Sequence, residues 1–315
     1  MPFDIKSGAP LYPSAAENYI EMFARHMSLR MQENKNLVTL TAGTPGAVGF
    51  YPDRRKAAGK QFVDVGICEQ EATSVAAGLA KGGARPVFGV MATFIQRAYD
   101  QLSQDIAINN VPAVVVDFSG GVWGIPDMTH LGFFDIAMAS NIPNFVFLAP
   151  ATAEEYLATL DWAIGQTEYP VFVRTPAGKV MHTERPVNMN FFEYEIVSQG
   201  EEVALIGAGS FLRIAEEAAD LLRKRGLNPT VINPRNLSQL DHATLDTLKD
   251  YKQVITLEDG IVDGGFGQKV AAYLGNSPVA VTVLGLQKEF LDRYDANEVL
   301  RANSLTPQQV ADLVK

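Results

Sequence analysis

One carboxylate, Glu69, follows a stretch that is expected to be a buried strand. The apolar run 61–67 (QFVDVGI) predicts this strand, and small residues at helical spacing between Ala72 and Ala80 predict a helix directly after it. A helix of small residues lets another group pack close, and a carboxylate buried beside it costs free energy unless it has a partner. Glu69 is therefore a candidate for acid–base chemistry. The alternative is an exposed carboxylate, or one that interacts with the dipole of the following helix.

Phe94 and Arg97 follow the next expected strand, residues 87–92 (VFGVMA). The ring of Phe94 could stack on a flat aromatic ligand, and the alternative is an ordinary core position. Arg97 is three residues further on and would lie on the same side of a helix as Phe94. The alternative for Arg97 is a solvated side chain. Both residues are candidates for binding a ligand.

His130 lies in the segment 127–132 (DMTHLG), and Arg174 lies in the apolar run 170–176 (PVFVRTP). A histidine can bond the hydroxyls of a substrate or shuttle a proton near neutral pH, although a lone histidine is more often structural. A guanidinium binds a phosphate through forked, charge-assisted hydrogen bonds. The alternative for Arg174 is a salt bridge at the edge of a domain.

Strands alternate with helices along the whole chain, which predicts parallel sheets in two layered α/β domains. We expect the first domain over residues 1–180 and the second over 193–315, joined by a linker near 176–193. The first helix is expected from Ser14 to Met31, with a capping box at Ser14–Glu17, and another helix is expected over 95–109. The expected strands are 37–43, 61–67, 87–92, 111–119, 144–150 and 170–176 in the first half, and 202–209, 228–235, 254–259 and 279–286 in the second.

Composition narrows the class of protein. With 315 residues, of which 47% are hydrophobic, the chain can bury a substantial core. The net charge of −10 argues against a nucleic-acid or anionic-membrane partner. Cys68 is the only cysteine, so no intrachain disulfide forms and a reducing compartment is expected. No apolar run is long enough for a signal region or a bilayer span, so we expect a cytoplasmic location.

The stretch from Asp64 to Arg97 resembles the pyrimidine-binding module of thiamine-diphosphate enzymes, in the branch of transketolase and deoxyxylulose-phosphate synthase. The similar segments are VGICEQ around Glu69, TFIQRAYDQ at 93–101, and DMTHLG at 127–132, which is similar to the family's DGPTHQG. The second half resembles the family's carboxy-terminal domain through PRNLSQLD, LEDGIVDGGFGQKV and LGLQKEF. In the family, that domain packs, helps the protein to dimerise and has no catalytic role.

The resemblance implies a role for each candidate residue. Glu69 would share a proton with N1′ of the aminopyrimidine ring, so that the cofactor's own amino group can act as the base. Phe94 would stack on that ring, and Arg97 would face the cofactor and the substrate. His130 would contact the sugar and Arg174 would bind its phosphate.

Two features depart from the family pattern. Pro126 stands where the family has an Asp four residues before the histidine, and Asp127 is one position out of register. The GDG motif that holds the diphosphate and Mg²⁺ is absent, and the first module begins almost at residue 1. The resemblance therefore implies a partner subunit that supplies the metal and diphosphate site, together with self-dimerisation.

We accordingly expect a subunit of a split transketolase, which transfers a two-carbon ketol unit between sugars or sugar phosphates. One alternative is a deoxyxylulose-phosphate synthase-like condensation of pyruvate with an aldehyde. Another is a relative that assembles but does not catalyse. A third is a nucleotide-binding module built on Gly207-Ala208-Gly209, which follows one expected strand and precedes a helix.

Overall fold

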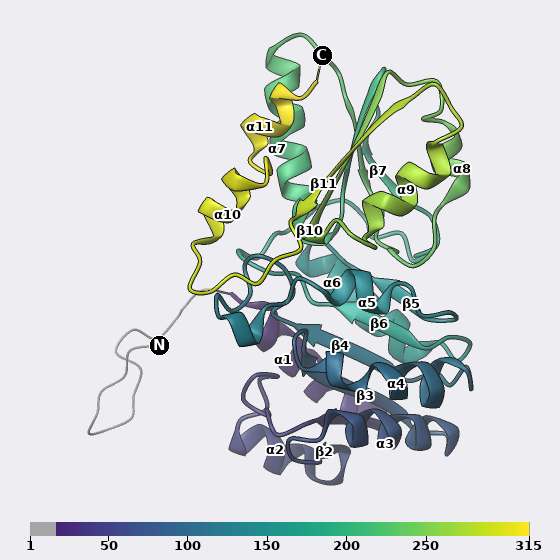
Figure 1. Cartoon of the computed structure of the whole chain (residues 1–315). Coiled ribbons are helices and arrows are strands. Elements are labelled where there is room, and N and C mark those ends of the chain that lie inside the picture. The colour runs from purple at the N-terminus through teal and green to yellow at the C-terminus, as the bar shows by residue number, and fades with distance from the viewer. Residues whose placement is uncertain (1–16, 315) are drawn as a thin grey trace.

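Six short, mainly apolar strands form the first sheet of the computed structural model, which describes residues 17–314 (Figure 1). All six pair in parallel, in the order β2-β1-β3-β4-β6-β5. Continuous apolar runs are typical of parallel strands that are covered on both faces, and this is how the strands were predicted. Their bounds are β1 (Leu37–Thr41), β2 (Phe62–Asp64), β3 (Arg85–Met91), β4 (Val114–Phe118), β5 (Val146–Leu148) and β6 (Val171–Arg174).

Helices cover both faces of this sheet. On one face α1 (Tyr19–Glu33) and α6 (Ala153–Gly165) bury their apolar sides in a common core. On the other face lie α3 (Glu69–Lys81), whose buried residues are mostly alanines, and the helical segment 95–107. The remaining elements are α2 (Pro52–Ala58), α4 (Tyr99–Gln101), α5 (Asp135–Ala139) and the 3-10 turns Gly59–Gln61 and Met128–His130.

Two predicted helices differ from the structure. Helix α1 begins at Tyr19, and its N-cap is Asn18, whose side chain accepts a hydrogen bond from the Glu21 N–H at 2.8 Å. The predicted cap at Ser14 lies outside the described residues. The predicted helix over 95–109 is divided into a 3-10 turn, α4 and a wider helical turn, Leu102–Ala107.

The second sheet has five strands in the order β11-β10-β8-β9-β7. Four strands are parallel, as predicted, but β7 pairs antiparallel with β9 at the edge and was not predicted. Helices α7, α10 and α11 lie on one face and α8 and α9 on the other (Figure 1). The bounds are β7 (Glu195–Ser198), β8 (Val203–Gly207), β9 (Thr230–Asn233), β10 (Gln253–Ile261), β11 (Ala280–Leu286), α7 (Leu212–Lys224), α8 (His242–Asp246), α9 (Phe266–Leu274), α10 (Ala296–Ala302) and α11 (Pro307–Asp312).

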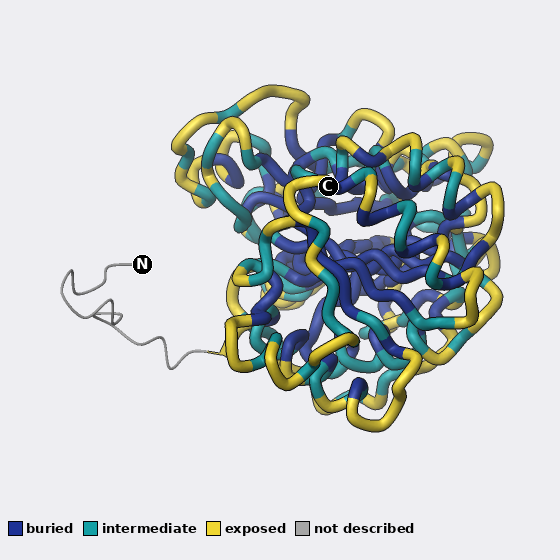
Figure 2. Tube along the Cα trace, turned by 90° about the horizontal axis from the view of Figure 1, so that it is seen from below, coloured by how far each residue is buried: buried dark blue, intermediate teal, exposed yellow. Residues whose placement is uncertain are grey.

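The strands form the buried centre of the molecule, and the exposed segments are mostly loops and outer helix faces (Figure 2). The two domains share buried side chains, because one hydrophobic cluster contains residues of β3 and α3 as well as of β9 and α9. Among residues 17–314 no helix has the length and apolar character that crossing a membrane requires.

Candidate active site

Glu69, Phe94, Arg97 and His130 come from segments that follow the carboxyl ends of β2, β3 and β4. In the sheet order β2-β1-β3-β4 these strand ends lie along one edge, with β1 between β2 and β3. β2 lies on one side of β1 and β3 lies on the other, so the strand order switches sides between β1 and β3. Ligands of open parallel sheets bind outside the carboxyl ends of the strands at such a switch. The topology therefore gathers four of the five predicted residues at the edge where a ligand is expected.

Glu69 is the first residue of α3 and its side chain is only 2% exposed. Its Oε2 lies 3.3 Å from Nη1 of Arg97, whose side chain is 55% exposed. The same Oε2 has no hydrogen-bond partner among the described residues. The surroundings of Glu69 are therefore not wholly apolar, because Arg97 supplies a nearby positive charge. One buried oxygen nevertheless remains available to a donor from a ligand.

The turn between β2 and Glu69 is held by Asp64. Its Oδ1 accepts hydrogen bonds from the backbone N–H groups of Gly43, at 2.8 Å, and Gly66, at 3.0 Å. These bonds tie the end of β2 to the loop after β1. Ile67, in the same turn, is 72% exposed although it is apolar. The turn thus presents an uncovered apolar side chain directly beside the buried carboxylate.

Phe94 and His130 are in contact, with ring centroids 5.3 Å apart in an edge-to-face arrangement. The hydroxyl of Thr93 also donates to the backbone carbonyl of Thr129 at 3.3 Å. Phe94 is half-buried against the first core, so it is neither a fully packed core residue nor a free surface side chain. The structure thereby joins the segment after β3 to the loop after β4.

His130 ends a 3-10 turn that begins at Asp127. The Asp127 Oδ1 accepts from the backbone N–H of Thr129 at 2.9 Å and from its hydroxyl at 2.6 Å. These bonds hold the pKa of Asp127 below its ordinary value, and the bond from the Thr129 hydroxyl has the largest effect. Nδ1 of His130 lies 2.7 Å from the Thr129 hydroxyl and 3.4 Å from Asp127 Oδ1. Asp127, which is one position out of register with the family's aspartate, therefore orients the His130 ring at Nδ1 together with the Thr129 hydroxyl.

Arg174 does not belong to this group. Its side chain is 5% exposed, and its guanidinium pairs with Asp135 at the start of α5 and with Asp259 in β10. The two carboxylates occupy the directions in which a phosphate would bind, so the predicted contact with a substrate phosphate is corrected. The alternative, a salt bridge at the edge of a domain, describes its position: Arg174 joins the two domains.

A third buried carboxylate, Asp117, lies opposite Arg174 in the register of β4 and β6. Neither of its oxygens has a hydrogen-bond partner among the described residues. Burial, reinforced by the charge of Asp135, raises the pKa of Asp117 well above its ordinary value. Its neutral form is thus favoured, which limits the negative charge that collects around the single guanidinium.

The residues at the carboxyl edge fit the aminopyrimidine of thiamine diphosphate. A ring nitrogen that carries a proton needs an acceptor, and Glu69 offers a buried oxygen that faces Arg97 but has no hydrogen bond within residues 17–314. An aromatic ring needs a face to stack on, and Phe94 is an accessible ring at the same edge. No three His, Cys, Asp or Glu side chains within residues 17–314 are arranged to hold a metal ion.

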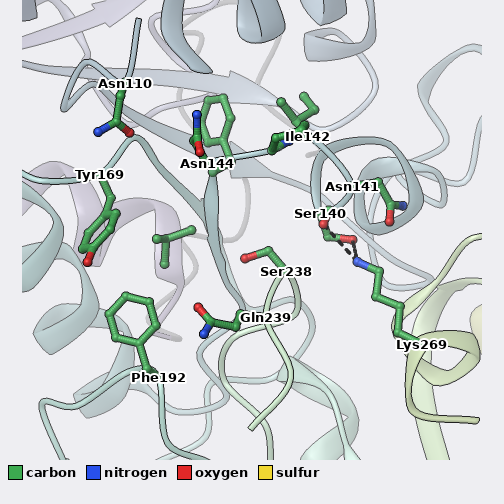
Figure 3. A pocket seen from close by; sticks show the side chains of 13 residues that line it. Asn110, Ser140, Asn141, Ile142, Asn144, Tyr169, Phe192, Ser238, Gln239 and Lys269 are labelled. Carbon is green, nitrogen blue, oxygen red and sulfur yellow. Dashed lines mark hydrogen bonds between the residues drawn. The ribbon is translucent and has the colours of Figure 1, made fainter. Parts of the chain in front are cut away.

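A cavity of about 500 Å³ lies elsewhere (Figure 3). It is lined by Asn110, Val146 and Tyr169, which lie at or before the amino ends of β4, β5 and β6, and so it opens at the opposite edge of the sheet. Lys269 at its wall donates to Ser140 and to the Leu237 carbonyl at 2.8–3.1 Å. Burial lowers the pKa of Lys269 to about 8. The three acceptors come from both domains, so this lysine connects the two domains and its hydrogen bonds are already used.

The glycine loop at Gly207-Ala208-Gly209 is buried between the domains. A side chain on Gly207 would lie 2.7 Å from the Leu212 Cα, so this glycine permits close packing of strand and helix. Gly209 packs against Ala149 of the first domain. A dinucleotide would need this loop to be open, and the structure therefore argues against the nucleotide-binding alternative.

The acidic partners of Arg174 were not predicted from the sequence. Asp135 and Asp259 lie 39 and 85 residues from it along the chain. A signal did exist, since Asp259 ends an apolar run that was predicted to be a strand, where a buried charge requires a partner. Asp64 was likewise not singled out, because an acceptor for turn N–H groups has no distinctive spacing.

Comparison with known proteins gives the family. The model of the transketolase pyrimidine binding domain matches residues 16–182, and that of the transketolase C-terminal domain matches residues 193–310. The 1-deoxy-D-xylulose-5-phosphate synthase of Symbiobacterium thermophilum is 36% identical over 325 residues, which cover 98% of this chain and 48% of that protein. The enzyme of the same name from Clostridium botulinum is 31% identical over 313 residues, covering 95% and 49%. The chain thus spans about half the length of these curated relatives.

Solved structures share the fold. A split gene transketolase, described as an inactive beta4 tetramer, matches with a TM-score of 0.83 at 24% identity, over 93% of this chain and 96% of that one. The transketolase of Pichia stipitis in complex with sedoheptulose-7-phosphate matches with a TM-score of 0.78 at 16% identity, over 95% and 45%. Since the pyrimidine-binding family model alone covers more than half of the sequence, the chain belongs to the transketolase family.

Proposed function

We propose that this chain is the pyrimidine-binding and C-terminal part of a thiamine-diphosphate-dependent transferase. The observation that carries the proposal is Glu69, a buried carboxylate whose Oε2 faces Arg97 but has no hydrogen bond among the described residues, at the same edge of the sheet as the half-buried ring of Phe94. A buried polar oxygen that lacks a hydrogen bond is costly, and a protonated ring nitrogen would supply that bond. Membership of a thiamine-diphosphate-dependent family supports the same assignment.

Each residue at the edge then has a defined task. Glu69 accepts the hydrogen bond from the protonated ring nitrogen of the cofactor and keeps that proton in place. Phe94 fixes the ring plane by stacking. Arg97 is exposed next to Glu69 and is suited to an anionic group of cofactor or substrate. His130 offers Nε2 to a substrate hydroxyl while Nδ1 is held by Thr129.

When bound, thiamine diphosphate supplies a nucleophilic carbon for attack on a carbonyl group. We propose that the transferred group is a two-carbon ketol unit, moved between sugars or sugar phosphates. The fold match to transketolases supports this choice. The second candidate, condensation of pyruvate with an aldehyde, is favoured by the sequence identity of 31–36% to deoxyxylulose-phosphate synthases.

We further propose that a second polypeptide supplies the diphosphate and Mg²⁺ site, since these residues contain no GDG motif and match a split gene transketolase over nearly its whole length. The exposed Ile67 beside Glu69 would be covered by that polypeptide. The existence of a split gene transketolase of nearly the same extent supports a separate partner subunit. Self-association through this chain and a cytoplasmic location complete the proposal.

The test is to copurify the tagged chain from its native cell and to assay the isolated pair. Two reactions are run in parallel: cleavage of a ketose with transfer to an aldose, and decarboxylation of pyruvate with an aldehyde present. The proposal predicts ketol transfer that requires thiamine diphosphate and both chains. Turnover of pyruvate alone would favour the second candidate. A pair that binds the cofactor but turns over neither substrate would identify a non-catalytic relative.

A further inference from the structure

The loop that carries His130 is anchored in the second domain, although it belongs to the first. It comprises residues 119–134, between β4 and α5. Its apolar side chains Val122, Leu131 and Phe133 are each at most 2% exposed, and all three are part of the hydrophobic core built by β8, β10, α7, α10 and α11. Protein cores are close-packed, so the loop cannot shift without disturbing the core of the second domain.

Hydrogen bonds from the second domain reach both halves of this loop. The Tyr294 hydroxyl donates to the Val122 carbonyl at 3.1 Å, and the backbone N–H of Arg293 donates to the Pro126 carbonyl at 2.9 Å. The backbone N–H of Ile261 donates to the Phe133 carbonyl at 3.0 Å. In the opposite direction, the backbone N–H of Met128 in the loop donates to Asp292 Oδ1 at 3.4 Å. The backbone of the loop is therefore held at several points along its length.

The segment 290–294, between β11 and α10, provides most of these contacts. In Figure 1 it is the yellow chain that runs along the boundary between the domains. The Tyr294 ring also packs on Phe133 with centroids 5.5 Å apart. Arg293 has a φ of 50°, a left-handed conformation that is unfavourable for a residue with a side chain. In this conformation the backbone N–H of Arg293 donates to the Pro126 carbonyl. The unfavourable backbone conformation thus occurs at the residue that contacts the loop.

The first turn of the loop rests on the ion pair between the domains. Gly121 has a φ of 75°, and any side chain there would overlap the Asp259 carboxylate, which pairs with Arg174. Gly121 also donates from its N–H to the Gly132 carbonyl at 2.7 Å, which closes the base of the loop. The second domain therefore supports the base of the loop as well as its length.

At its far end the loop contacts the candidate cofactor site, because His130 packs on Phe94 and Thr129 accepts from Thr93. We infer that the C-terminal domain, through Tyr294 and the segment 290–294, positions His130 for the substrate. The resemblance assigns that domain no catalytic role; its role here is to position a residue of the first domain through the loop. The inference rests on the proposed function for the role of His130, and Tyr294 is a positioning residue.

The test uses a matched pair of variants of the full chain. Tyr294→Phe removes the hydroxyl that bonds the loop and keeps the ring on Phe133. Tyr251→Phe is the control, because its hydroxyl donates to the Gly200 carbonyl, also at 3.1 Å, and its other partners, Gln199 and Thr230, likewise belong to the second domain. Hydrogen–deuterium exchange is measured on peptides from 119–134. We expect exchange in Tyr294→Phe to be about threefold to tenfold faster than in wild type, as for loss of one neutral hydrogen bond, and unchanged in Tyr251→Phe.

In the reconstituted enzyme Tyr294→Phe should raise the KM for the sugar several-fold, while the affinity for the cofactor changes less than twofold. The reason is that Glu69 and Phe94 lie outside the loop. Equal loop exchange in the two variants, or an unchanged KM in Tyr294→Phe, would overturn the inference. If loop exchange rises but the wild-type pair shows no cofactor-dependent turnover, the anchoring of the loop stands and the proposed function fails.

Discussion

Replacing Arg174 by methionine is expected to destabilise the chain by about 3–5 kcal/mol, the cost of leaving buried charges without their partner. The side chain of Arg174 is 5% exposed and those of Asp135 and Asp259 are fully buried, so water cannot compensate for its loss. Methionine has a similar length and keeps the apolar contacts. The loss should appear in urea unfolding of the variant at pH 7.

Arg185→Met is the control for this prediction. Arg185 also pairs with two carboxylates, Glu195 at 3.1 Å and Glu216 at 3.3 Å, but its side chain is 37% exposed. Exposed pairs typically contribute about 0.2–1 kcal/mol, so this variant should be nearly as stable as wild type. The comparison separates the effect of burial from that of the number of ion pairs.

The penalty in Arg174→Met should also depend on pH. Burial raises the pKa of Asp259 even with the guanidinium present, and removing the positive charge raises it further. The folded variant then binds protons that the unfolded chain releases, so its stability relative to wild type should fall as the pH rises above the ordinary pKa of an aspartate. An Arg174→Met chain as stable as Arg185→Met, with a raised KM for a phosphorylated sugar, would refute this reasoning and restore the phosphate-binding role.

Two further predictions concern the cofactor ring and a buried acid. Phe94→Leu keeps an apolar side chain but loses the aromatic face on which the cofactor ring would stack. Titration of the assembled enzyme with the cofactor should show binding weaker by about two- to twelvefold, equivalent to ~0.5–1.5 kcal/mol. An unchanged affinity would exclude the stacking contact. Burial raises the pKa of Glu258 from 4.5 to about 7, so the folded chain retains a proton there and its stability should fall as the pH rises between these values. Glu258→Gln should lack this component in urea unfolding, and a stability difference from wild type that stays constant across pH would contradict it.

The sheets were predictable because parallel strands covered on both faces are apolar throughout. The runs that contain β1, β3, β4 and β8 were identified in this way. The edge strand β7 was not, since its pattern of buried and exposed residues is weak and, within residues 17–314, it pairs with β9 alone. The start of α1 was misplaced because several residues before Tyr19 are compatible with capping, and only the structure identifies Asn18.

The positions of Glu69, Phe94 and Arg97 at one edge follow from local order, because each comes within a few residues of a predicted strand end. His130 lies in the middle of a longer loop, and its contact with Phe94 places it at the same edge. Contacts between distant segments could not be predicted. The Tyr294 hydroxyl and the Val122 carbonyl are 172 residues apart in the chain. The pairing of Arg174 with Asp259 likewise depends on how the domains meet, and no spacing in a single sequence records that arrangement.

The central claim is that the buried carboxylate of Glu69 holds a proton on the cofactor ring. It is tested most directly by comparing Glu69→Gln with Glu71→Gln in the assembled, cofactor-saturated enzyme. Glu71 is two residues away in the same first turn of α3 but is exposed, so it undergoes the same chemical change outside the site. We predict that Glu69→Gln lowers kcat by about 10²–10⁴-fold and that Glu71→Gln stays within about twofold of wild type. Equal activity in the two variants would contradict the claim.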